Sequence, residues 1–347
     1  MPHAAATCVL ALDQGTTSSR AILFDAAGMP AGVAQEEFPQ HARESIGPDG
    51  EDLGIVEHDP EDIWQTQLSC ARRVLASTGT TPEAVAAIGI TNQRETTILW
   101  EKATGKPVAP AVVWQSRVSA PICRRLAAAG IEPELKHRTG LVLDPYFSAT
   151  KIVHLLETIP GLRARCERGE ILFGTVDTFL VWRLTGGRVH ATDVTNASRT
   201  LLFDIRELAW SDELCRMFGV PRAILPEVRP SAGSFGSVDA ALLGAEISIT
   251  GCAGDQEAAA FGQGVEQPGD AKTTYGTGAF LVFATGDRLV ESSNGLLTTP
   301  MCHVATAGRQ TPPQYCLEGS VFVAGALVGW LRDGLGLIEQ AADIEPL

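Results

Sequence analysis

The sequence lacks the long apolar runs and the basic leading segment that mark membrane and secreted proteins. No apolar stretch approaches the roughly 20 residues that span a bilayer, and no basic segment precedes the short apolar run that begins at Cys8. We therefore expect no membrane insertion and a cytoplasmic location.

Positive charge is scarce as well. The 347 residues include 27 lysines and arginines against 41 aspartates and glutamates, a formal net charge of −14. Binding to nucleic acid or to an anionic membrane surface depends on clustered cations, so this balance argues against both partners. A phosphate site in such a chain must rely on backbone N–H groups, Mg²⁺ and a few placed cations.

Several common signatures of chemistry are missing. The eight cysteines are dispersed with no Cys-x-x-Cys pair, which favours reduced, buried thiols over a metal centre. No Gly-x4-Gly-Lys-Ser/Thr is present, and no Gly-x-Gly-x-x-Gly opens a helix. Neither P-loop nor dinucleotide chemistry is therefore supported.

What the sequence does contain is a glycine-hydroxyl turn between two apolar runs. Residues 8–12 are typical of a buried strand and residues 21–24 of its partner. Gly15 would let the backbone N–H groups of the turn approach a polyanion closely, and Asp13 could hold Mg²⁺ against it, directly or through water. Because Asp-x-Gly-Thr is also a common hairpin turn, an ordinary turn is the alternative.

A similar unit lies far downstream. Residues 270–278 contain Gly276-Thr277-Gly278 and lead into the apolar run 280–283. Two glycine-threonine hairpins indicate two related lobes with a nucleotide held between them, each lobe giving backbone and hydroxyl donors to the phosphates.

Strands and helices alternate as in an α/β protein. Strands are expected at residues 7–12, 20–25, 31–38 and 86–90, and residues 43–54 form a polar, exposed loop. A helix should begin after Asp59, its N-cap, with Pro60 in the first turn and a buried stripe of Ile63, Leu68, Ala71 and Leu75. A further helix is expected over residues 148–157.

Polar side chains follow several of the predicted strands, where open α/β sheets bind their ligands. Arg94 and Glu95 follow the strand at 86–90, although a salt-bridged loop is the alternative for this pair. Trp114 and Tyr146 follow later segments and could equally be core residues. Glycines on both sides of Cys252 and Ala253 would let the backbone turn sharply there and present Asp255 at the start of a small-residue helix. In that position Asp255 could cap the helix or take a proton from a substrate hydroxyl.

Several segments in order along the chain resemble the glycerol kinases of the FGGY carbohydrate kinase family. The most specific blocks are Asn92-Gln93-Arg94-Glu95-Thr96-Thr97 and Leu143-Asp144-Pro145-Tyr146-Phe147. The others are residues 13–20, 113–115, 173–178, 195–199, 254–256 and 274–278. One departure is His154, which stands where the family usually has tryptophan. The resemblance implies an α/β, two-lobed actin- and hexokinase-like (ribonuclease H-like) ATPase fold with the active site in the cleft.

The resemblance also implies roles for individual residues in phosphorylating glycerol with ATP and Mg²⁺ to give glycerol 3-phosphate. Asp255 would be the general base and Asp13 the residue that organises Mg²⁺. The expected glycerol contacts are Arg94, Glu95, Trp114, Tyr146, Asp255, Gln256 and Phe280. The expected nucleotide contacts are Asp13, Gln14, Gly15, Thr16, Thr17, Ser18, Arg20, Thr277, Gly278 and Gly325.

By the same resemblance, residues 1–250 form the N-terminal lobe and residues 251–347 begin a C-terminal lobe that is incomplete. Family chains continue past the position of Leu347, so residues for adenine and ribose would lie outside this sequence. A homo-oligomer is expected for the full-length form. Two alternatives stay open: an FGGY kinase for another polyol or a ketose, and a truncated homologue that binds or regulates without catalysis.

Overall fold

A five-stranded mixed sheet carries the first half of the architecture. The computed structural model describes residues 7–276, 278–304 and 312–345. The sheet has the strand order β14-β6-β1-β2-β3. Its strands are β1 (Cys8–Gln14), β2 (Ser18–Phe24), β3 (Pro30–Glu37), β6 (Val85–Asn92) and β14 (Ile249–Gly254). β1 pairs antiparallel with β2 and parallel with β6, which pairs parallel with β14.

The strand pattern explains how the sheet is covered. Along β1, Leu10 and Leu12 are buried while Val9 is 42% exposed, because alternate side chains point to opposite faces. Two helices, α1 (Pro60–Thr78) and α6 (Val176–Leu184), cover the face that carries the leucines and complete one hydrophobic core. The predicted start of α1 is confirmed, since the Asp59 side chain accepts a hydrogen bond from the Glu61 N–H.

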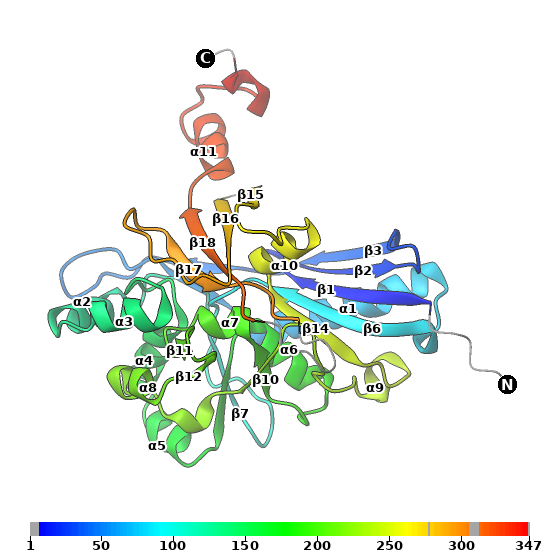
Figure 1. The fold of residues 1–347 in the computed structure, drawn as a ribbon, viewed down its shortest axis with the longest axis horizontal. Helices are drawn as coiled ribbons and strands as arrows, with labels where there is room; N and C mark the ends of the chain where they lie inside the picture. The colour runs from blue at the N-terminus through cyan, green and yellow to red at the C-terminus, as the bar shows by residue number, and fades with distance from the viewer. Residues whose placement is uncertain (1–6, 277, 305–311, 346–347) are drawn as a thin grey trace.

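A four-stranded antiparallel sheet follows in the last third of the chain, in the order β15-β16-β18-β17. Its strands are β15 (Ala271–Tyr275), β16 (Ala279–Gly286), β17 (Leu297–Pro300) and β18 (Tyr315–Val321). The helix α10 (Asp255–Gly262) connects the two sheets, and α11 (Gly325–Gly329) stands away from the rest of the described chain (Figure 1). The segments around α11 expose large apolar side chains, including Leu327 and Trp330.

Most of the remaining elements lie beside the first sheet (Figure 1) and pack around a second hydrophobic core, whereas α9 contributes Leu243 to the first core. The helices are α2 (Ala120–Ala128), α3 (Glu132–Thr139), α4 (Ser148–Thr158), α5 (Leu162–Glu167), α7 (Val194–Ser198), α8 (Asp212–Phe218) and α9 (Ala240–Leu243). The small sheets use β4 (His41–Arg43), β5 (Ile55–His58) and β8 (Ala111–Val112); β7 (Ile98–Glu101) and β9 (Ile171–Gly174); β10 (Ala191–Asp193) and β13 (Glu227–Arg229); and β11 (Phe203–Asp204) and β12 (Ala209–Trp210).

Most predicted elements are confirmed within two or three residues, and two details differ. The predicted sharp turn around Cys252 and Ala253 is wrong, because β14 runs without a break through both residues to Gly254 and hands over directly to α10. The loop at residues 43–54 has local structure, with a bridge between Ile46 and Asp52. Within the described ranges, no helix is both long enough and apolar enough to cross a membrane.

Candidate active site

Three parallel strands deliver the polar residues of the site to one edge of the five-stranded sheet. In the register, Gln14 of β1 and Gly254 of β14 both pair with Asn92 of β6. The side chains that follow these strands therefore meet, and Arg94 and Asp255 come together although 160 residues separate them. This is the edge at which open α/β sheets place ligands.

A cavity of about 340 Å³ opens at this edge, at the small end of the roughly 300–1,000 Å³ typical of small-molecule sites. All seven residues predicted to contact glycerol line it. Of the predicted nucleotide residues, Thr16, Thr17 and Gly278 line it. Five further residues lie in the wall that were not predicted as site residues: Gln40, Gln93, Gln115, Thr274 and Gly276.

Asp255 is the first residue of α10 and presents a partly accessible carboxylate to the cavity. Its Oδ1 lies 3.4 Å from Arg94 Nε, and its Oδ2 accepts a hydrogen bond of 3.2 Å from the Gln256 amide. The residue in the N-cap position is Gly254, and Asp255 makes no capping hydrogen bond. The alternative in which Asp255 merely caps the helix is thereby wrong, and its carboxylate instead contacts Arg94 and Gln256 in the cavity wall.

Lys272 of β15 orients the Gln256 amide. The Lys272 ammonium donates 2.6 Å to Gln256 Oε1 and 2.7 Å to Thr274 Oγ1. With its oxygen held by the ammonium, Gln256 must turn its NH₂ group toward Asp255. Burial lowers the pKa of Lys272.

Arg94 and Glu95 belong to a cluster of five buried charged side chains, which we call the buried charge cluster. The other members are Arg199 after α7, Glu257 on α10 and Glu318 on β18. Arg94 Nη1 donates 2.7 Å to Glu257 and 2.8 Å to Glu318, and Arg94 Nη2 donates 2.8 Å to the other Glu318 oxygen. The alternative of a salt-bridged loop therefore holds in part, because Arg94 and Glu95 are ion-paired and also line the cavity.

Glu95 adopts a backbone conformation that side-chain-bearing residues rarely take, with φ at 61°. The hydroxyl of Ser148 donates 2.9 Å to the Glu95 carbonyl, and the Thr97 hydroxyl donates 3.2 Å to the same oxygen. A left-handed conformation costs roughly 1–3 kcal/mol and persists where the surroundings over-determine it, commonly at binding sites.

The protonation of the cluster follows from its charge balance, three carboxylates against two guanidiniums. Burial raises the pKa of Glu257 to about 7, against the partial compensation by Arg94. Burial also acts on Glu318, yet Arg199 and Arg94 together lower the pKa of that carboxyl. Burial also raises the pKa of Glu95. Glu257 is therefore one of two members of the cluster whose pKa is raised, and its Oε2 is a buried atom without a hydrogen-bond partner among the described residues.

We expect Glu257→Gln to flatten the dependence of stability on pH. The pKa of Glu257 rises from 4.5 to about 7 on folding. Between these values the folded protein holds a proton that the unfolded chain has released. The contribution of Glu257 to stability is full below about pH 4.5 and is lost as the pH rises toward about 7. Denaturant unfolding at several pH values in this range measures the slope.

The exposed Glu246 supplies the matched control, because Glu246→Gln removes a carboxylate from solvent and should keep the wild-type slope. Some slope should survive in Glu257→Gln, since burial also raises the pKa of Asp177 to about 6. An unchanged slope in Glu257→Gln would show that this carboxyl does not take up a proton on folding.

Three aromatic rings form the apolar wall of the cavity. Trp114 meets Tyr146 and Phe280 edge-on, with ring centroids 5.8 and 6.5 Å apart. The Trp114 indole N–H also donates 3.0 Å to the Thr16 hydroxyl of the first hairpin. Burial raises the pKa of Tyr146, so its phenol stays protonated and can donate to a ligand oxygen.

The first hairpin closes as a tight turn, in which the Gly15 N–H donates 3.0 Å to the Ser18 carbonyl. A Cβ at Gly15 would lie 3.1 Å from that same oxygen, so a side chain would crowd the turn. Gln14 is fully buried and accepts a hydrogen bond from Ser19, which directs it into the protein and not into the cavity. The side chain of Arg20 lies 3.9 Å from Asp13 and also donates to Gln35.

Asp13 fits the chemistry of a Mg²⁺ ligand. Its carboxylate is about one-third exposed, and burial raises its pKa, with the nearby negative charge of Asp255 acting in the same direction. Such mutual repulsion between carboxylates is relieved by a divalent cation, and oxygen ligands are what Mg²⁺ prefers.

The second hairpin joins the end of the described chain to the cavity. The Gly276 N–H donates 2.8 Å to the Gly278 carbonyl, and the Gly325 N–H donates 2.9 Å to the Gly276 carbonyl. A Cβ at Gly278 would come within 2.7 Å of the Val321 carbonyl. Gly325 therefore lies behind the hairpin and not in the cavity wall, and Thr277 lies outside the described residues.

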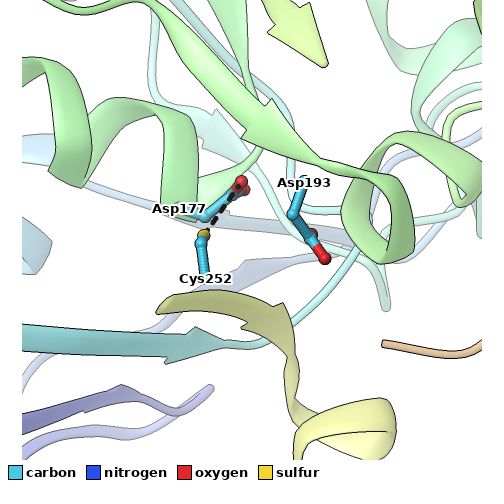
Figure 2. Close-up of side chains that lie close together, drawn as sticks. All are labelled: Asp177, Asp193 and Cys252. Carbon is cyan, nitrogen blue, oxygen red and sulfur yellow. Dashed lines mark hydrogen bonds between the residues drawn. The ribbon is translucent and has the colours of Figure 1, made fainter. Parts of the chain in front are cut away.

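A second group of carboxylates lies deeper, where Asp177, Asp193 and Cys252 approach one another closely enough to hold a metal ion (Figure 2). Hydroxyl groups donate hydrogen bonds to the carboxylate oxygens. Asp177 accepts from Thr175 and Thr192, and Asp193 accepts from Ser231. These hydrogen bonds account for the carboxylates without a cation.

Asp193 helps to fix the edge of the sheet at which the cavity opens. Asp193 caps α7 and accepts from the Thr195 hydroxyl, which in turn accepts 2.8 Å from the Gly254 N–H. A Cβ at Gly254 would lie 2.6 Å from the Arg94 side chain. Asp193 therefore helps to hold the last residue of β14 against Arg94, immediately before Asp255.

Comparison with known proteins gives consistent results. The N-terminal domain of the FGGY family of carbohydrate kinases matches residues 8–262. Glycerol kinases from Xanthobacter autotrophicus and Thermus brockianus are each 56% identical to this chain over 99% and 98% of its length. The chain spans 66% of the length of either relative.

Solved structures agree on the fold. The crystal structure of Plasmodium falciparum glycerol kinase with ADP matches 98% of this chain with a TM-score of 0.88 and 33% identity, and the match covers 65% of that protein. A xylulose kinase from Lactobacillus acidophilus matches 94% of the chain and 62% of its own length with a TM-score of 0.80 at 17% identity, which speaks for the fold alone.

Proposed function

Because the chain belongs to the FGGY family of carbohydrate kinases, we propose that it phosphorylates glycerol with ATP, yielding sn-glycerol 3-phosphate. The observation that carries the proposal is the cavity itself. Its wall combines the accessible carboxylate of Asp255, which lies 3.4 Å from Arg94, with Glu95 and with the aromatic rings of Trp114, Tyr146 and Phe280. A small polyol needs polar groups for its hydroxyls and apolar contact for its carbon skeleton, and this cavity offers both.

The residues of the cavity would divide the transfer between them. Arg94, Glu95 and Tyr146 would bind hydroxyls of glycerol, while Trp114 and Phe280 pack against its carbons. Asp255 would accept the proton of the terminal hydroxyl as that oxygen forms its bond to the γ-phosphorus of ATP. The bond from this phosphorus to the leaving oxygen breaks, ADP departs, and the proton remains on Asp255.

The phosphates of ATP would lie over the two hairpins, near Thr16, Thr17 and Gly278. Asp13 would hold Mg²⁺, which supplies neutralisation of phosphate charge when bound. Gln14, Gly15, Ser18 and Arg20 would shape the first hairpin behind these contacts, and Thr277 and Gly325 are proposed in the same way for the second hairpin.

We further propose a lobe boundary near residue 250, a cytoplasmic location and a homo-oligomeric full-length form. The boundary is supported by the end of β14 at Gly254 and the start of α10 at the next residue, close to the division between residues 250 and 251. The other two proposals rest on the resemblance to glycerol kinases.

Titration calorimetry and a coupled assay for ADP release test the function. We expect the full-length protein to bind glycerol saturably and more tightly than D-xylulose, and to release ADP in a reaction that depends on glycerol and Mg²⁺. ADP release with the pentulose and none with glycerol would favour a ketose kinase. Binding of glycerol without any ADP release would favour a protein that binds or regulates.

A further inference from the structure

Glu318 is the centre of the buried charge cluster. Its two oxygens accept hydrogen bonds from Arg94 at 2.8 Å each and from Arg199 at 3.2 and 3.3 Å. Without the negative charge of Glu318, two buried guanidiniums would face each other with reduced compensation. Glu318 therefore determines where both arginines lie.

The contacts of Glu318 and Glu257 leave only one edge of the Arg94 guanidinium for the cavity. Both terminal nitrogens of Arg94 point at carboxylates of the cluster, and the remaining Nε faces Asp255 at 3.4 Å. Arginine presents its donors in a rigid planar fork, so a bidentate partner on one side dictates the direction of the other edge.

Arg199 performs the same task for Glu95 and Tyr146. Its Nε donates 2.6 Å to Glu95 Oε1, which leaves Oε2 for a ligand hydroxyl. Its guanidinium carbon also lies 5.7 Å from the centre of the Tyr146 ring. Glu318 accepts hydrogen bonds from this guanidinium and so fixes its position. Neither Glu318 nor Arg199 lines the cavity.

We propose that Glu318 and Arg199 are positioning residues for the polyol: through Arg94, Glu95 and Tyr146 they set the polar groups that discriminate between alcohols. This inference rests on the proposed function and extends it to residues without ligand contact. Stability alone is a poor explanation for the cluster, because the free energy lost when charged groups leave water often exceeds the free energy gained when they pair. Positioning explains why the cluster is built around the cavity residues.

Glu318→Gln tests the inference, because glutamine keeps the shape and removes the charge. Calorimetry measures the affinity for glycerol and for 1,2-propanediol, which lacks one terminal hydroxyl. We expect the affinity for glycerol to fall roughly 10–100-fold, the loss that accompanies weakened hydrogen bonds to charged groups. The affinity for the diol should fall much less, so the preference for glycerol over the diol should shrink.

Arg199→Lys is the second variant, in case Glu318→Gln fails to fold. Lysine keeps the positive charge in the cluster but cannot hold Glu95 and Glu318 with one planar fork. We expect the same loss of preference for glycerol, with a folded protein by circular dichroism.

The matched control is Asp204→Asn, which alters another largely buried carboxylate paired with an arginine. Asp204 accepts 3.2 Å from Arg138 and lies outside the cavity wall. We expect a lower melting temperature in this control and affinities within about two-fold of wild type, since distant sites act independently.

The outcomes separate the inference from the proposed function. If the wild-type chain does not bind glycerol, the proposed function fails and the inference fails with it. If the wild type binds glycerol and prefers it to the diol, but the Glu318 and Arg199 variants keep that preference, the cluster is only structural and the inference alone is overturned.

Discussion

The Asp255→Asn variant is expected to turn glycerol over roughly 10²–10⁴ times more slowly than wild type, the range that general-base catalysis contributes. Asparagine preserves the shape of the side chain at the start of α10 and can still accept from Gln256, so glycerol should bind with nearly unchanged affinity. The amide cannot take the proton of the hydroxyl that attacks the phosphorus. Steady-state turnover and calorimetric affinity, measured on the same preparation, test the two statements separately.

A turnover within a few-fold of wild type would exclude Asp255 as the base. Gln256→Glu offers a useful contrast, because it places a carboxylate on the neighbouring position while leaving Asp255 in place. Lys272, which contacts Gln256 Oε1, can pair with the new carboxylate. We therefore expect this variant to retain far more turnover than Asp255→Asn.

The largest loss of stability is expected for Arg94→Met. Without this guanidinium, the three buried carboxylates of the cluster share a single arginine, Arg199. Breaking a buried ion pair costs about 3–5 kcal/mol of stability. Glycerol binding should disappear as well. The difference in free energy of unfolding between wild type and variant should be smaller at acid pH, because the unpaired carboxyls can then take up protons. It should grow as the pH rises. Denaturant unfolding near pH 5 and near pH 8 measures the free energy of unfolding at the two pH values.

Arg183→Met is the control for Arg94→Met. Arg183 pairs with the partly exposed Glu61 at 2.7 and 3.0 Å, outside the candidate active site. Its removal should reduce stability less, with little change between the two pH values and no change in glycerol affinity. If both variants lost the same stability and the loss did not depend on pH, the carboxylates of the buried charge cluster would not depend on Arg94 for charge compensation.

Local patterns explain why the sequence predicts much of the fold. The apolar run of residues 8–12 marks β1, and the sequence Asp59-Pro60 marks the start of α1 through capping and a preset backbone angle. Glycine-rich segments are less informative, because glycine permits both turns and strands. This ambiguity accounts for the wrong turn predicted at Cys252 and Ala253, where pairing with β6 keeps the chain extended.

The cavity residues that could be predicted are polar side chains at strand exits or members of family motifs. Glu318 and Glu257 could not be found in this way, because the arginine that each of them contacts lies far away in the sequence. Arg199 ends one of the segments that resemble the family, which signals its presence but not its contacts. Gln40 follows an exposed strand, and it lines the cavity while donating a hydrogen bond to Gln115 from a distant segment, so no local pattern marks it.

The pairing of Arg94 with Glu318 also sets when the site can form. The two residues are 224 positions apart in the chain. At a synthesis rate of roughly 5–20 residues per second, Glu318 leaves the ribosome roughly 10–45 s after Arg94. During that interval the first sheet can fold, but Arg94 and Glu95 lack the partner that orients them. The proposed polyol site is therefore a late product of biogenesis, completed only when β18 joins the nascent structure.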